Sequence, residues 1–199
     1  HIIFELNDGN ILIHLGMTGI IKFSKKPSNL KIDKHDHYEI KLKDKSILRY
    51  NDVRKFGSIH WAKNIKEHFL IKNLGVEPLT KHLDISYLKN VIKNRSVSIK
   101  NLIMNQNIIV GIGNIYACEA LHTSKIKPQK KSKLLSNNEL SLLVNNIKFV
   151  LRKAIAAGGT TLKDFKSLDG STGYFKQELL IYNKDYCECG KKVKNIKLG

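Results

Sequence analysis

The spacing of apolar residues changes once along this chain of 199 residues, and that change limits the folds open to it. Over residues 1–61 apolar and polar side chains alternate in short runs, and Asn7-Asp8-Gly9 stands between two runs as a hairpin signal. Gly75 and Pro78 interrupt this pattern, and beyond them the apolar residues recur with a helical period. The sequence therefore predicts an α+β fold, in which an antiparallel β-sandwich part precedes a helical domain.

Residues with capping side chains mark the starts of the predicted helices. Asp84 begins a helix that extends to residue 93, and Ser98 begins a short one that ends at residue 104. Ser136 and Glu139 form a capping box for a long amphipathic helix, which Gly158-Gly159 terminates. We therefore expect a β-sandwich portion over 1–75, a linker over 76–82, a helical domain over 83–158, and short β-like pieces over 159–199.

Two glycines lead directly into one of the helices, in the segment Gly111-Ile112-Gly113-Asn114. Such glycines permit a sharp turn with positive φ, and Asn114 is suited to cap the helix that follows. A helix N-terminus presents N–H groups and a positive dipole end, which together suit a phosphate. An ordinary loop-to-helix junction is the alternative, since the spacing is neither a dinucleotide-binding fingerprint nor a Walker loop.

The charge balance favours a phosphate-bearing partner. Lys and Arg number 35 against 17 Asp and Glu, for a net charge of +18, and such a surface favours phosphate backbones over acidic metabolites or neutral ligands. An A/T-rich coding sequence is a second possible source of the many lysine, isoleucine and asparagine residues. The charge therefore supports nucleic-acid binding without establishing it.

Composition also bears on the compartment. No apolar run approaches the roughly 20 residues that cross a bilayer, and three cysteines, an odd number, favour a reducing cytoplasm over a secreted disulfide framework. We expect a cytoplasmic protein with no membrane partner. Because the chain opens on His1 in what reads as the middle of a strand, we also expect that the printed sequence lacks its natural beginning.

Five short motifs occur in a fixed order. They are Leu-Gly-Met-Thr-Gly at 15–19, Asp-Val-Arg-Lys-Phe-Gly at 52–57, Gly-Ile-Gly-Asn-Ile-Tyr-Ala-Cys-Glu at 111–119, Gly-Gly-Thr-Thr-Leu-Lys-Asp-Phe at 158–165, and Gly-Tyr-Phe at 173–175. Together they closely resemble the formamidopyrimidine-DNA glycosylase family, bacterial enzymes that excise oxidised purines such as 8-oxoguanine. The resemblance covers essentially the whole chain. It implies a β-sandwich domain, a helix–two-turns–helix domain, and then a lesion-capping loop and a zinc-finger hairpin within 159–199.

The resemblance also implies a partner and a set of DNA-binding residues. The partner is double-stranded DNA carrying oxidised bases, bound by a monomer in the bacterial cytoplasm at the nucleoid. Met17 would fill the space of the extruded base, Arg54 would address the orphaned partner base, and Phe56 would insert beside it. The residues implied to touch the DNA are His35, Arg54, Arg95, Asn114 and Lys163. The alternatives are a buried strand residue for Met17, a core aromatic for Phe56 and a solvated helix-end charge for Arg95.

The family's catalytic residues have no counterpart in the printed sequence. By resemblance the nucleophile is an N-terminal proline, assisted by an adjacent glutamate and a later lysine, and all three precede His1. The proline amine would attack the sugar, release the base and form a Schiff base, and strand cleavage would follow. We assign no catalytic role to Glu5, on a predicted strand, or to Glu119, which would complement a helix dipole. We expect this fragment to bind DNA without cleaving it.

The cysteines depart from the family's zinc hairpin, which has two Cys-x-x-Cys pairs. Here Cys187-Glu188-Cys189 is one residue shorter, and no second pair follows in the printed sequence. Two thiolates do not complete a tetrahedral structural zinc site, so zinc is doubtful in this chain although the resemblance implies it for the family. Cys118, amid apolar neighbours, is expected to be a core residue.

Three functions stay open. The first is a DNA glycosylase with abasic-site lyase activity that removes oxidised purines, and the second is a non-catalytic remnant that still binds damaged DNA. The third is the sister endonuclease VIII-type branch, which acts on oxidised pyrimidines. Met17 and the segment at 158–165 favour the purine branch.

Overall fold

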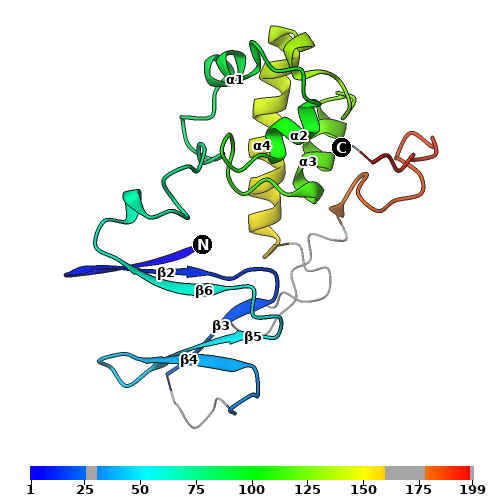
Figure 1. Ribbon diagram of the computed structural model, residues 1–199. Helices are drawn as coiled ribbons and strands as arrows, with labels where there is room; N and C mark the ends of the chain where they lie inside the picture. The colour runs from blue at the N-terminus through cyan, green and yellow to red at the C-terminus, as the bar shows by residue number, and fades with distance from the viewer. Residues whose placement is uncertain (26–30, 160–177, 198–199) are drawn as a thin grey trace. The chain divides into compact units, whose positions relative to one another are not determined.

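The computed structural model describes residues 1–25, 31–159 and 178–197 and divides them into two compact units (Figure 1). The described part of the first unit, the β unit, comprises residues 1–25 and 31–72. The described part of the second, the helical unit, comprises residues 73–159 and 178–197.

Among the described residues of the β unit, six strands form two antiparallel three-stranded sheets. In one sheet β2 (Gly9–His14) lies between β1 (Ile2–Leu6) and β6 (Ser58–Ala62), and in the other β5 (Ile47–Asp52) lies between β3 (Gly19–Ser24) and β4 (Asp36–Lys41). Leu6 stands opposite Gly9, so Asn7 and Asp8 form the turn that the hairpin signal predicts. A short 3-10 helix, η2 (Ile65–Glu67), follows the last strand.

The two sheets pack face to face. Ile13 of the first sheet and Tyr50 of the second are buried, and both line one small cavity formed by residues of the two sheets. Strand geometry explains this, because alternate side chains point to the same side of a sheet and the apolar ones gather there. The predicted antiparallel β-sandwich part is confirmed.

Four α-helices make up most of the part of the helical unit that the structure describes. They are α1 (Ile85–Ile92), α2 (Ile99–Met104), α3 (Asn114–Thr123) and α4 (Asn137–Ala156), with a 3-10 helix, η3 (Ser132–Leu134), before α4. Asp84, Ser98 and Ser136 each accept a hydrogen bond at their side chain from the N–H three residues later, and the predicted capping box is present. The four helices share one apolar core, which includes Leu88, Leu102, Leu121 and Leu143.

The C-terminal segment 178–197 belongs to the helical unit, with Leu179 in the same core. Within residues 178–197 the chain turns back on itself once. Tyr186 and Lys192 form an isolated bridge, and the Cys187 N–H donates to the Lys191 carbonyl at 3.0 Å. The described helices include none with the length and apolar character needed to span a bilayer.

Candidate nucleic-acid interface

Two loops of the β unit pack directly against one another. One is the turn 15–18 between β2 and β3, and the other is the loop 53–57 between β5 and β6. Gly16 has a φ of 60°, and a Cβ there would lie 2.8 Å from the Phe56 carbonyl carbon, so glycine is what allows this approach. The Thr18 hydroxyl accepts a hydrogen bond from the Arg54 N–H at 3.2 Å. Met17, Arg54 and Phe56 are thereby brought onto neighbouring loops.

A buried carboxylate holds both loops in place. Asp52 is 0% exposed, and its Oδ1 accepts from the Thr18 hydroxyl at 2.6 Å and the Arg54 N–H at 3.3 Å. Its Oδ2 accepts from the Gly57 N–H at 2.9 Å and the Tyr50 hydroxyl at 3.0 Å. Burial acts to raise the pKa of Asp52, but the hydrogen bonds outweigh it and bring the pKa from 3.8 to about 2. Asp52 is therefore ionised and fully partnered, a role that the sequence interpretation missed.

The apolar side chains on these loops face solvent. Met17 is 58% exposed and Phe56 is 56% exposed, so the alternatives that placed them in the core are wrong. The Arg54 guanidinium carbon lies 4.6 Å from the centre of the Phe56 ring, which is a cation–π contact. The surface thus presents a flexible thioether, an aromatic ring and a planar set of donors.

A third loop is tied to the same residue. The Asp52 N–H donates to the His35 carbonyl at 3.0 Å, and the His37 Nε2 lies 2.8 Å from the Asp52 carbonyl oxygen. His35 itself is half-buried, and its N–H donates to Asp33 Oδ1 at 2.8 Å. We call Met17, His35, Arg54 and Phe56 the loop cluster, because Asp52 anchors the three loops that carry them.

The glycine turn lies in the helical unit at the start of α3. Gly111 has the positive φ that was predicted, 74°, and its N–H donates to Gln106 Oε1 at 2.9 Å. The prediction that Asn114 caps α3 is wrong. Gly113 already has the extended backbone of a cap residue, with φ of −92° and ψ of −176°, and no side-chain cap of the helix is found among the described residues. Asn114 is instead the first helical residue, is exposed, and accepts a hydrogen bond at Oδ1 from the Cys118 thiol at 3.8 Å.

Open space surrounds this turn. A Cβ built at Gly111 or Gly113 would meet no described atom within 4 Å. The φ of Gly113 is one that any residue adopts, so neither the backbone nor the packing of the described residues requires glycine there. A helix start without a side-chain cap leaves its first-turn N–H groups and the positive end of its dipole available to a ligand. The geometry suits an anion such as a phosphate.

The remaining predicted DNA contacts are divided between described and undescribed residues. Arg95 is exposed just beyond α1, and its carbonyl accepts from the Ser132 hydroxyl at 2.8 Å and the Lys133 N–H at 3.1 Å. Its backbone is therefore fixed while its side chain lies at the surface. Lys163 and the predicted lesion-capping loop lie outside the described residues.

Glu119 has a role that the sequence interpretation did not find. It was expected to complement the helix dipole, but Glu119 lies beyond the first turn of α3 and is buried, with 2% of its surface exposed. Its Oε2 accepts from the Leu180 N–H at 2.8 Å, and its Oε1 accepts from the N–H groups of Ile181 at 3.0 Å and Tyr182 at 2.8 Å. Glu119 thus fastens the C-terminal segment to α3. These partners are more than 60 residues away in the sequence, so no local pattern indicates them.

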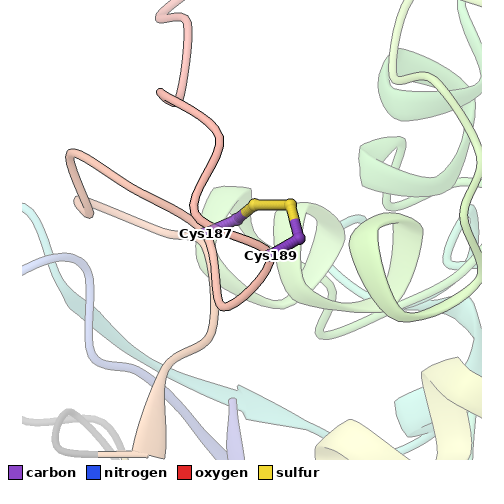
Figure 2. The surroundings of a disulfide bond; sticks show 2 residues. All are labelled: Cys187 and Cys189. Atoms are coloured by element: carbon purple, nitrogen blue, oxygen red, sulfur yellow. A yellow bond between two sulfur atoms is a disulfide. The ribbon is translucent and has the colours of Figure 1, made fainter.

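The cysteine pair forms a disulfide between Cys187 and Cys189, which the odd cysteine count did not indicate (Figure 2). Two sulfur atoms supply only half of a tetrahedral zinc site. Over the described ranges, no group of three His, Cys, Asp or Glu side chains is placed to hold a metal. The residues present do not fit the zinc that the resemblance implies for the family. The expectation for Cys118 is also wrong, because it is half-exposed on α3 and not part of the core.

Comparisons with known proteins agree on one family. Residues 1–59 match the formamidopyrimidine-DNA glycosylase N-terminal domain, and residues 74–166 match the formamidopyrimidine-DNA glycosylase H2TH domain. The formamidopyrimidine-DNA glycosylase of Haemophilus influenzae (strain PittEE) is 45% identical over 202 residues, which cover 100% of this chain and 74% of that protein. The enzyme of Rickettsia bellii is 44% identical over 92% of this chain and 67% of its own length.

Solved structures show the same likeness. The glycosylase of Lactococcus lactis, bound non-covalently to DNA that contains an AP site, has a TM-score of 0.84 and 32% identity over 98% of this chain and 72% of its own. The Thermus thermophilus protein has a TM-score of 0.82 and 27% identity over 94% of this chain and 70% of its own. The chain matches both domain models in the expected order, has relatives along its full length and shares their fold. The chain therefore belongs to the formamidopyrimidine-DNA glycosylase family.

Proposed function

We propose that this chain is the damage-recognising part of a DNA glycosylase of base-excision repair, acting on oxidised purines such as 8-oxoguanine and formamidopyrimidines. The observation that carries the proposal is the loop cluster. An exposed thioether, an aromatic ring and a guanidinium are anchored by one buried carboxylate, in a member of a family whose relatives bind damaged DNA. Of the described residues, Arg95 and the start of α3 are proposed to grip the DNA backbone.

The chemistry of the loop cluster suits base extrusion. A base inside a duplex cannot be reached, so it is turned out of the stack and the vacancy is filled. Met17 has a flexible side chain that adapts to an irregular space, and Phe56 supplies an apolar wedge. Arg54 offers paired donors to the edge of the orphaned base. Because Gly16 and Asp52 hold these loops together, the three side chains are positioned before DNA arrives.

We place bond cleavage outside the printed residues. By resemblance the nucleophile is an N-terminal proline that precedes His1, which would form the Schiff base of a combined glycosylase and abasic-site lyase. Borohydride trapping on a duplex with 8-oxoguanine opposite cytosine tests this. We expect no covalent adduct with the 199 residues and an adduct with a chain that carries the proline end. An adduct with the 199 residues would show that a residue within them is the nucleophile.

Binding to lesion and undamaged duplexes of one sequence tests the loop cluster. Arg54→Lys keeps the charge and removes the planar fork, so its loss should be confined to the lesion duplex and amount to about 1–3 kcal/mol, or about fivefold to more than a hundredfold in affinity. Phe56→Ala should behave similarly, and Phe69→Ala, also exposed in the β unit, is its matched control. Equal losses on both duplexes for Arg54→Lys and Phe56→Ala would contradict the assigned roles.

The two other functions remain distinguishable. A duplex with an oxidised pyrimidine that binds more tightly than the 8-oxoguanine duplex would favour the endonuclease VIII-type branch. An in-frame stop or frameshift upstream of the His1 codon would favour the non-catalytic remnant, and an in-frame Met-Pro-Glu start would favour the enzyme. We place the activity in the bacterial cytoplasm at the nucleoid and expect a monomer.

A further inference from the structure

Two histidine rings meet at one end of the first sheet of the β unit. His14 is the last residue of β2, the central strand of that sheet, and His1 directly precedes β1. Ile2 pairs with Ile13 in the antiparallel register, so the next position along the strands places His1 opposite His14. The Nδ1 atoms of the two rings lie 3.2 Å apart, and the ring centres lie 4.7 Å apart. The strand pairing thus brings the two imidazoles together.

The separation of the two nitrogens is that of two ligands on one metal ion. Histidine nitrogens bind Zn²⁺ at about 2.0–2.1 Å, so two of them lie about 3.3–3.4 Å apart at a tetrahedral angle and about 2.8–3.0 Å apart at a right angle. The observed 3.2 Å falls between these values. At such a separation two rings directed at one ion have their centres about 5 Å apart, whereas a straight N–H···N hydrogen bond places them about 5.5 Å apart. The observed 4.7 Å is closer to the arrangement around an ion.

A second pair of histidine rings in the β unit is bonded to other groups. The ring centres of His60 and His68 lie 4.9 Å apart. His60 Nε2 lies 2.7 Å from the Ser58 hydroxyl oxygen, and His68 Nδ1 accepts a hydrogen bond from the Leu70 N–H at 3.3 Å. One nitrogen of each ring therefore already has a partner, and this pair provides a matched control for the first.

We propose that His1 and His14 form a binding site for one divalent late transition-metal ion, such as Ni²⁺ or Zn²⁺. Imidazole nitrogens suit these ions, whereas Mg²⁺ and Ca²⁺ prefer oxygen ligands. Over residues 1–25, 31–159 and 178–197 no group of three His, Cys, Asp or Glu side chains is placed to hold a metal. The other coordination positions of the ion are therefore left to water or to a donor atom of another molecule. The inference goes beyond the proposed function and does not depend on it.

The site lies at the base of the loop cluster. His14 leads directly into the turn 15–18, which carries Met17. The His14 carbonyl also packs against the loop 53–57, since a Cβ built at Gly57 would lie 2.5 Å from that oxygen. An ion held by both histidines links β1 to β2 at this point and adds positive charge beside the cluster. Because the folded chain alone pairs the two rings, the ion should stabilise the β unit.

Calorimetric titration with Ni²⁺ tests the site in the 199-residue chain, in about 0.15 M salt to screen the net charge of +18. The variant His1→Gln/His14→Gln removes the proposed ligands, and His60→Gln/His68→Gln removes the same number of imidazoles from the same unit. Loss of a group that only supports a metal ligand costs about 10–100-fold in affinity, so loss of the ligands themselves should cost at least about tenfold. The control should match wild type. Equal losses in the two variants, or no binding of Ni²⁺ by wild type, would overturn the inference.

A single substitution guards against a folding defect. His14 is half-buried, whereas His1 is exposed, so His1→Gln carries little risk to folding. It should also lose about tenfold or more in Ni²⁺ affinity. Wild type should bind Co²⁺ more weakly than Ni²⁺, and an equal concentration of Mg²⁺ should not displace Ni²⁺. Wild-type affinity in His1→Gln, or displacement by Mg²⁺, would contradict the assignment.

The α-amine of His1 is a competing nitrogen ligand in the 199-residue chain. Placing Gly-Ser before His1 moves the terminal amine away and keeps both rings. We expect the extended chain to bind Ni²⁺ as the 199-residue chain does, and to lose that binding when His14→Gln is added. Loss of binding on extension alone would show that the terminal amine and one ring hold the ion, and would overturn the inference.

Resistance to urea gives a second readout. An ion that binds the folded chain and not the unfolded one raises the unfolding midpoint as its concentration exceeds the dissociation constant. Circular dichroism should show this rise with Ni²⁺ for wild type and for His60→Gln/His68→Gln, and no rise for His1→Gln/His14→Gln. A rise in all three chains would place the ion elsewhere and refute the site.

Discussion

Replacement of Asp52 by asparagine should loosen two loops at once, although Asp52 itself is buried away from any ligand. Its two oxygens accept four hydrogen bonds, from Thr18, Tyr50, Arg54 and Gly57. In Asp52→Asn one oxygen becomes an NH₂ group, which donates hydrogen bonds and cannot accept them. Two of the four donor groups then lose their acceptor. Leaving buried donors without acceptors costs about 1–3 kcal/mol each, of which relaxation recovers a part, so we expect a loss of about 2–4 kcal/mol at pH 7.

The pKa of Asp52 in wild type gives an independent value for the stability that this carboxylate contributes, and the sign of its dependence on pH. Asp52 has a pKa of about 2 in the folded chain against an ordinary value of 3.8. A pKa lowered by folding contributes stability above the ordinary value, and that contribution is lost as the pH falls from about 4 towards 2. At about 1.36 kcal/mol per pH unit, the difference corresponds to about 2 kcal/mol. Wild type should therefore lose this amount between pH 4 and pH 2, and Asp52→Asn should not.

Urea unfolding monitored by tryptophan fluorescence is the appropriate assay, because Trp61, the only tryptophan in the chain, lies on β6 and reports on the β unit. At neutral pH the midpoint of Asp52→Asn should fall by about 1–2 M urea. Asp8→Asn makes the same chemical change at the exposed β1–β2 turn and should leave the midpoint unchanged. A wild-type midpoint in Asp52→Asn, or a stability gap that stays constant from pH 5 to pH 2, would refute the reasoning.

Three further predictions concern the helical unit. Glu119→Gln should release the N–H groups of residues 180–182, so their hydrogen exchange should accelerate by about tenfold or more while the amides of α4 keep their protection. Gly113→Ala should leave the melting temperature within about 1 °C of wild type and weaken DNA binding by about tenfold, because its φ is ordinary and its surroundings are open to a ligand. Ser136→Ala should lower the stability of the helical unit by about 1 kcal/mol in urea titrations, through loss of the capping box with Glu139.

Local rules anticipated the parts of this fold that depend on near neighbours. The caps of Asp84, Ser98 and Ser136 each involve an N–H three residues away, so the sequence contains both partners of the bond. The β1–β2 hairpin is local in the same sense. The prediction for the cap of α3 was wrong although it too depended on near neighbours. Gly113 and Asn114 are adjacent and both residue types suit an N-cap, and the backbone geometry places Gly113 there.

Local rules could not predict the contacts of the buried carboxylates. Asp52 contacts Thr18 across 34 positions, and Glu119 contacts Leu180 across 61. In each case the partners include backbone N–H groups, which every residue except proline carries, so residue type gives no signal. Helix position alone therefore indicated that Glu119 complements the helix dipole. The alternation of apolar and polar residues likewise could not predict whether Met17 and Phe56 are exposed. An apolar residue in a loop packs inward or outward according to the fold around it.

The burial of Asp52 and Glu119 bears on DNA binding, because the surface that meets the DNA then carries fewer carboxylates. The chain has 35 basic and 17 acidic side chains, and Glu139 is a third carboxylate bound internally, to Lys130 and to the N-cap of α4. Asp52 and Glu119 still count in the net charge, but because they are buried they do not come within contact distance of a bound phosphate, where an exposed carboxylate repels it most strongly. Replacing these carboxylates should change folding and leave the salt dependence of DNA binding nearly constant, whereas replacing exposed lysines that contact the DNA should do the reverse. Stability and electrostatic attraction are thus carried by separate sets of charged residues, which is why the two can be measured independently in this chain.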